Sequence, residues 1–118
     1  MKGHVEIIKM RLRRQKPSLV FINDYPCDEQ LNWHKYGDHA TVCVHGDPIE
    51  SLDFRFLVGT RVSITSMDEG RTKRLFERVK SAGAEEVVAG HAIPGGALFV
   101  KTGWTEIWHK GEGDGRNT

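Results

Sequence analysis

The sequence has only 2 cysteines and 4 prolines among its 118 residues, and it has no long apolar run. Two cysteines exclude a disulfide-rich secreted scaffold, and no stretch approaches the roughly 18 apolar residues that a membrane-spanning helix needs. The charged start of the chain also lacks the apolar core of a signal peptide. These absences predict a cytoplasmic protein with no membrane segment, and the length fits one domain.

The second half of the chain has the periodicities of a βαβββ unit, in which one helix separates a first strand from three later strands. An apolar stripe flanked by arginines and lysines predicts the principal helix over about residues 67–82, and Gly83 is expected to end it. Ser66 and Glu69 have the spacing of a capping box at the helix start. Period-two patterns predict strands over residues 61–66, 84–92, 97–101 and 104–110.

The first half of the chain is less regular. Residues 23–40 read as a long polar loop, and residues 47–59 fit both an alternating strand and a helical turn followed by extended chain, of which we favour the second. We predict a single α+β domain over residues 1–110 with a mainly antiparallel sheet, and a disordered tail over residues 111–118. The alternating patterns of this half predict strands over residues 5–14, 19–23 and 41–45.

The net charge of +1 hides two segments of opposite sign, because residues 1–17 carry a charge of +5 and residues 23–55 carry −5. Two explanations stay open: the segments pair with each other, or the basic segment binds a phosphate or an acidic partner. On the predicted N-terminal strand, Lys9, Arg11 and Arg13 would form a basic stripe on one face. Such a stripe predicts nucleic-acid binding through backbone electrostatics.

A cluster of cysteines and histidines lies between residues 27 and 45. Thiolates and imidazoles are ligands that zinc prefers, so the cluster makes zinc a candidate cofactor. The alternative is a buried Cys43 in the core with exposed histidines around it, and the spacing matches no common zinc finger. The five candidate ligands are Cys27, His34, His39, Cys43 and His45.

The polar loop combines carboxylates with large aromatic rings. Asp24, Tyr25, Trp33 and Tyr36 are therefore candidate partner-binding residues, because rings in loops often anchor protein contacts. The alternative is that the rings fold back over the edge of the core. Neither a serine-hydrolase motif nor a phosphate-binding glycine loop follows a predicted strand, so no residue is assigned a catalytic role.

Two segments resemble known groups of proteins. Residues 61–108, with Ser-Ala-Gly-Ala ending the helix and a Pro-Gly-Gly turn, resemble one βαβββ module of the glyoxalase or vicinal-oxygen-chelate superfamily. This resemblance implies a metal-binding or small-molecule-binding module with Glu106 in its pocket, beside His91 or His109. Residues 21–27 and 52–59 resemble small uncharacterised proteins of temperate phages and prophages, which implies an accessory protein that binds a host or phage macromolecule.

These observations predict a small cytoplasmic, non-enzymatic interaction module that binds a host or phage macromolecule, with a protein as the favoured partner. Two alternatives remain: a metal or small-molecule module of the vicinal-oxygen-chelate type, and nucleic-acid binding through the basic N-terminal strand. A homodimer is also feasible, because the edges of a half-open sheet offer a surface for pairing.

Overall fold

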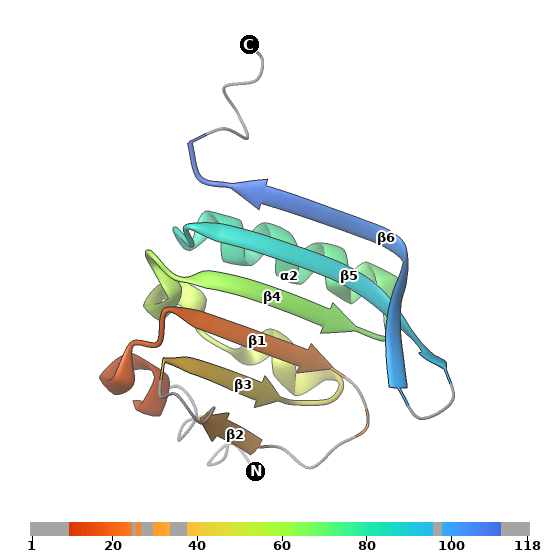
Figure 1. Ribbon diagram of the computed structural model, residues 1–118, viewed down its shortest axis with the longest axis horizontal. Helices are drawn as coiled ribbons and strands as arrows, with labels where there is room; N and C mark the ends of the chain where they lie inside the picture. Colours follow the sequence, from red (N-terminus) through yellow and green to blue (C-terminus); the bar gives the residue numbers. More distant parts are fainter. Residues whose placement is uncertain (1–9, 25, 27–29, 34–37, 96–97, 112–118) are drawn as a thin grey trace.

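A six-stranded sheet forms the framework of the protein, and helix α2 and two 3-10 turns, η1 and η2, lie on one of its faces (Figure 1). This computed structural model describes residues 10–24, 26, 30–33, 38–95 and 98–111. No helix in this part of the chain is long and apolar enough to cross a membrane. The elements in chain order are β1 (Leu19–Asp24), β2 (Gln30–Trp33), β3 (His39–Cys43), η1 (Asp47–Ser51), η2 (Phe54–Leu57), β4 (Arg61–Ser66), α2 (Glu69–Ser81), β5 (Glu86–Gly95) and β6 (Leu98–His109).

The strand order is β2-β3-β1-β4-β5-β6, and the four inner strands are parallel. Each outer strand, β2 or β6, is antiparallel to its neighbour. The prediction of an α+β domain with one principal helix is confirmed, but the sheet is mixed rather than mainly antiparallel. The physical reason lies in two crossovers, through η1 and η2 and through α2, which return the chain to the same end of the sheet before β4 and β5 begin.

Alternate residues of the central strands point toward α2 and are buried. Val20 and Ile22 do so in β1, and Val62 and Ile64 do so in β4. The same alternation places two polar residues on this face where the strands end, and these begin the polar centre described below. The apolar side chains that α2 and the 3-10 turns contribute to this core include Ile49, Leu52, Phe54, Leu57, Leu75, Phe76 and Val79.

Helix α2 begins after Asp68, whose carboxylate accepts a hydrogen bond from Arg71 N at 2.7 Å. The predicted capping box is therefore wrong: the hydroxyl of Ser66 accepts from Asp68 N and donates to a carboxylate on β1. At the other end, Gly83 has a φ of 97°, which a residue without a Cβ adopts at least cost. The principal helix is confirmed, two residues later at its start than expected.

The N-terminal strand is a wrong prediction within the described residues, because residues 10–15 are helical. Leu12 is buried in the core, and Lys16 N donates to Leu12 O at 2.9 Å. Arg11 and Arg13 are exposed, but residues two apart lie on nearly opposite sides of a helix, so they do not form a stripe. Lys9 lies outside the described residues. Within residues 10–15, Leu12 is the one apolar side chain that reaches the core, and a single helical turn places it there as well as a strand would.

Three further predictions differ from the structure. The polar loop contains β2, and residues 54–57 form the turn η2 where we expected extended chain. The strands expected over residues 97–101 and 104–110 are one strand, β6, so Gly103 is an irregularity with a φ of 70° inside it. The unit that begins with β4 is therefore βαββ rather than the predicted βαβββ. The predicted tail lies, apart from Gly111, outside the described residues.

Replacing Asp68 with alanine should destabilise the protein by about 1 kcal/mol, the typical cost of losing an N-cap acceptor. Asp68→Asn keeps a side-chain oxygen for Arg71 N and should retain most of the stability. Urea unfolding followed by circular dichroism measures both changes. Equal stability of the alanine and asparagine variants would contradict the capping role.

Candidate functional site

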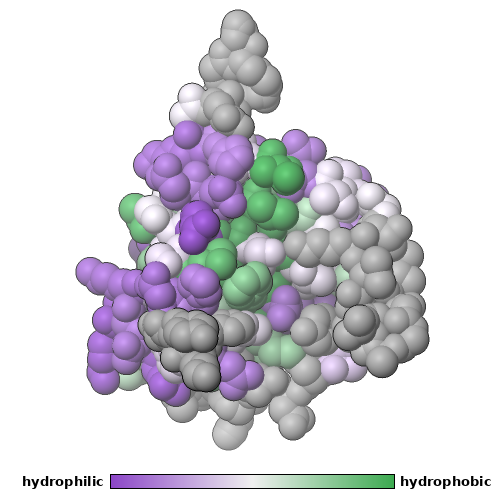
Figure 2. All heavy atoms as spheres, viewed as in Figure 1, coloured by the Kyte–Doolittle hydropathy of each residue, from purple (hydrophilic) through white to green (hydrophobic). Residues whose placement is uncertain are grey.

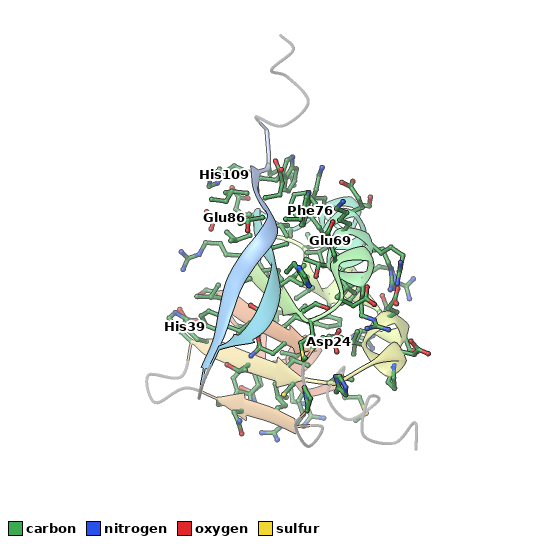
Figure 3. All side chains as sticks on the ribbon, turned by 90° about the vertical axis from the view of Figure 1, so that its right-hand side faces the viewer. Asp24, His39, Glu69, Phe76, Glu86 and His109 are labelled. Atoms are coloured by element: carbon green, nitrogen blue, oxygen red, sulfur yellow. The ribbon has the colours of Figure 1, made fainter. Side chains whose placement is uncertain are left out.

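A polar centre lies where three adjacent parallel strands end. Asp24 ends β1, Ser66 ends β4, and His45 follows β3. Asp24 is 1% exposed and lies on the face that α2 covers, as Figure 3 shows from the end of the sheet where these strands finish. The carboxyl ends of parallel strands are where open α/β sheets usually bind ligands, so this centre is the first place to look for function.

The Asp24 carboxylate is surrounded by hydrogen-bond donors. Its Oδ1 accepts from Gly46 N at 2.7 Å and lies 3.1 Å from His45 Nδ1. Its Oδ2 accepts from Ser66 Oγ at 2.7 Å and from Arg71 Nη1 at 3.2 Å. Burial alone raises the pKa of a carboxyl group, but these hydrogen bonds and the charge of Arg71 outweigh burial and lower the pKa of Asp24. The centre therefore holds an ionised carboxylate in the interior.

Arg71 connects this centre to the turn η1. Its guanidinium also contacts Asp47 Oδ1 at 2.7 Å and Glu50 Oε2 at 3.1 Å. Arg74 contacts the Glu50 carboxylate at 2.9 and 3.0 Å. The hydrogen bond from Arg74 is the largest cause that lowers the pKa of Glu50 to about 2, and Arg71 adds to it against the effect of burial. These pairs join the acidic middle segment to the arginines of α2, a pairing that the charge pattern of the sequence did not indicate.

His45 is the accessible member of the centre, with a side chain that is 48% exposed. A carboxylate at Nδ1 favours the tautomer that carries its proton there, which leaves Nε2 as the basic nitrogen. The centre is not a nucleophile triad, because the fully buried hydroxyl of Ser66 donates to Asp24 rather than to the imidazole.

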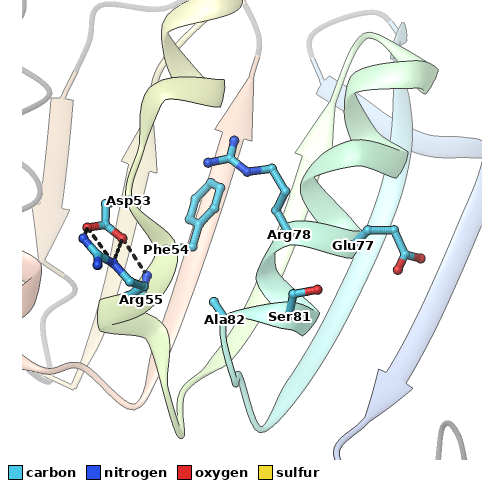
Figure 4. A pocket seen from close by; sticks show the side chains of 7 residues that line it. All are labelled: Asp53, Phe54, Arg55, Glu77, Arg78, Ser81 and Ala82. Atoms are coloured by element: carbon cyan, nitrogen blue, oxygen red, sulfur yellow. Dashed lines mark hydrogen bonds and ion pairs between the residues drawn. The ribbon is translucent and has the colours of Figure 1, made fainter.

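A shallow cavity of about 420 Å³ lies between η2 and the last turns of α2 (Figure 4). The Arg78 guanidinium covers the Phe54 ring at 4.7 Å, and Asp53 and Arg55 are paired at the cavity rim. The cavity lies at the C-terminal end of α2, whereas Arg71 and the polar centre lie at the N-terminal end. The cavity and His45 are therefore separate features and do not form one site.

Of the four residues predicted to bind a partner, the structure describes Asp24 and Trp33. Asp24 is buried in the polar centre and is not available as a contact residue. Trp33 ends β2 and packs against the core, and its buried indole nitrogen has no acceptor in the described part of the chain. Tyr25 and Tyr36 lie outside the described residues. For Trp33, the structure therefore shows the alternative in which the ring folds back over the core.

Three of the five candidate zinc ligands, His39, Cys43 and His45, lie within the described residues. His39 begins β3 and His45 follows its end, so these two side chains start about 20 Å apart along the chain, well beyond the reach of one zinc ion. Cys43 is buried and disulfide-bonded. Cys27 and His34 lie outside the described residues, and the described residues contain no group of three or more metal-ligating side chains. Zinc binding stays a prediction.

The residues of the vicinal-oxygen-chelate resemblance have other neighbours. His109 Nδ1 lies 3.2 Å from Glu86 Oε1 on the face away from α2 (Figure 3), whereas Glu106 alternates onto the opposite face of β6. His91 Nε2 lies 3.2 Å from Met67 O, and its Nδ1 is 3.9 Å from Glu69. The structure therefore does not bring Glu106 and His109 together.

Strand β6 presents a second feature of interest, because it is the last strand of the sheet. Trp104 packs edge-on against Phe76 of α2 with ring centroids 5.4 Å apart, and Lys80 covers the Trp108 ring at 5.6 Å. The other face carries Ile107, which is 57% exposed and paired with Val88. Figure 2 shows hydrophobic side chains in a band that runs inward from β6 on this face.

Sequence reasoning found the alternation of β6 but not its buried side. The spacing of Trp104, Glu106 and Trp108 defines one face, and only the position of α2 shows that this face is covered. Sequence reasoning also missed that Asp24 is an interior residue. The signal for it was the alternation of β1, which places Asp24 on the same face as Val20 and Ile22.

Comparison of the chain with protein-family models, with curated proteins and with solved structures finds no match. Function is therefore inferred from the geometry of this chain.

Acidification from pH 4.5 to about 2 should remove stability that Glu50 provides. The pKa of Glu50 falls from an ordinary 4.5 to about 2 on folding. The unfolded chain therefore binds the proton first, and protonation favours unfolding across this interval. Glu50→Gln should lower stability at neutral pH and make the decline with falling pH shallower, as measured by urea unfolding at a series of pH values.

The matched control for this measurement is Glu77→Gln, which removes an exposed carboxylate from α2, the helix that carries Arg71 and Arg74, and should keep the wild-type slope. A Glu50→Gln protein with the full wild-type pH dependence would show that the ion pairs with Arg71 and Arg74 contribute nothing to folding.

Proposed function

We propose that this chain is an interaction module that binds its partner by adding a strand to the outer edge of β6. The observation that carries the proposal is the position of β6 in the sheet, where it pairs with β5 alone among the described strands. The outer edge of such a strand presents backbone N–H and C=O groups to a further strand. Strand addition at a sheet edge is a common way to recognise an extended segment of another protein.

The composition of β6 supports this proposal. Proteins usually protect long edges with devices such as proline, but residues 104–109 contain Trp, Thr, Glu, Ile, Trp and His and no proline. Trp, Thr and Ile all favour extended backbone. The register shift between Gly90 and Ala92 of β5 falls opposite residues 102–104 of β6, so residues 105–109 pair with β5 in unbroken register. The opposite edge of the sheet, β2, is only 4 residues long and offers less backbone to a partner.

Packing against α2 also holds the β6 edge in place. Trp104 and Trp108 pack under α2, and Lys73 lies 5.8 Å from the Trp104 ring centroid. Helix α2 is in turn fixed to the strand ends through Arg71. A preformed edge loses little conformational entropy when a strand is added, which increases the affinity available from a small contact.

The Ile107→Lys variant should weaken partner binding on the order of tenfold, because it places a charge on an apolar side chain that an added strand would cover. Val58→Lys is the matched control, since Val58 is 62% exposed and follows η2, away from β6. Both variants and the wild type are used to capture partners from extracts of the source cell, and affinities for the recovered partner are then measured by titration.

Two results together would support strand addition: loss of affinity in Ile107→Lys alone, and protection of β6 backbone amides from hydrogen exchange when the partner binds. Unchanged affinity in Ile107→Lys, or protection confined to another element, would contradict it.

A further inference from the structure

We infer that the strand added to β6 is β6 of a second copy of this chain, antiparallel and centred on Trp108, so that Glu106 lies opposite Lys110 of the partner subunit. This inference rests on the proposed strand addition and names its partner. The contact would be isologous, with the same residues contributed by each copy.

The symmetry of the contact limits the registers that are possible. In a two-fold antiparallel pair, directly opposed residues share a face, so a residue of the face toward α2 opposes another residue of that face. Trp104, Glu106 and Trp108 belong to this face. Lys110 continues the alternation, and Lys110 N donates to Glu85 O at 2.9 Å, which extends the β5–β6 ladder by one step. Each permitted register therefore has one residue opposite itself on the axis.

The charges on this face distinguish between the three registers that are centred on Glu106, Ile107 and Trp108. With Glu106 on the axis, two carboxylates would lie directly opposite each other with Cβ atoms about 5 Å apart, which is repulsive. With Ile107 on the axis, Glu106 would face Trp108 of the partner subunit and its charge would have no opposed cation. With Trp108 on the axis, both copies place Glu106 opposite a lysine and the two indoles meet across the axis. Aromatic pairs and pairs of opposite charge are the favourable cross-strand combinations.

The strand is therefore self-complementary in charge, because Glu106 lies two residues before Trp108 and Lys110 lies two residues after it. Ile107 would at the same time oppose His109 of the partner subunit on the other face, where it gains cover for a side chain that is exposed in the single chain. The net charge of +1 gives two copies little overall repulsion to overcome. Because the paired segment is short, covering about residues 106–110, the affinity is expected to be in the micromolar range.

The test uses the full chain and a charge exchange. Sedimentation equilibrium of the wild type, from low micromolar to submillimolar concentration, should show a reversible monomer–dimer equilibrium. Glu106→Lys sets lysine against lysine and Lys110→Glu sets glutamate against glutamate, so each should raise the dimer Kd at least about tenfold. The double variant restores opposite charges and should return the Kd to near the wild-type value. Urea midpoints of all variants verify that these exposed positions leave the fold intact.

Three outcomes would overturn the inference: a wild type that stays monomeric at submillimolar concentration, a double variant that fails to recover, or single variants that dimerise as well as the wild type. A monomeric protein that still loses a captured partner in Ile107→Lys would refute the second copy while leaving strand addition intact. If Ile107→Lys changed neither dimerisation nor capture, both the inference and the proposed function would fail.

Discussion

The buried carboxylate of Asp24 is the interaction on which the arrangement of the other elements depends. It accepts hydrogen bonds from the turn after β3, from the end of β4 and from α2, so four segments distant in sequence meet at one group. A charge in the interior is tolerated only when it is paired and fully hydrogen-bonded. Any displacement of α2 or η1 would leave a donor or the carboxylate unsatisfied, and the centre therefore allows one relative placement of these elements.

The placement of α2 has consequences at the far edge of the sheet. The same helix that contacts Asp24 through Arg71 packs Phe76 against Trp104 and covers the aromatic face of β6. A β6 strand without this cover would expose two indoles. The placement of the proposed binding edge thus depends, through α2, on a polar cluster at the ends of the central strands.

The polar centre lies where many α/β sheets bind a ligand, but its hydrogen-bond donors are directed to Asp24. In many α/β sheets the carboxyl ends of the strands leave backbone and side-chain donors free for a ligand. Here Gly46, Ser66 and Arg71 all donate to Asp24, and Arg71 contacts two further carboxylates. These donors contribute to the cohesion of the chain itself. His45 is the member of the centre with a substantially exposed side chain, beside an otherwise internally satisfied cluster.

Local patterns in the sequence determined the principal helix, its end at Gly83 and the strands β1, β4 and β5, because each depends on neighbouring residues alone. The direction of strand pairing, the helical form of residues 10–15 and the continuity of β6 depended on contacts between distant segments, which no local period contains. The candidate site divides in the same way. Sequence marked Trp104, Glu106 and Trp108 as one face, but only the packing of α2 decided that this face is covered and that Asp24 lies inside.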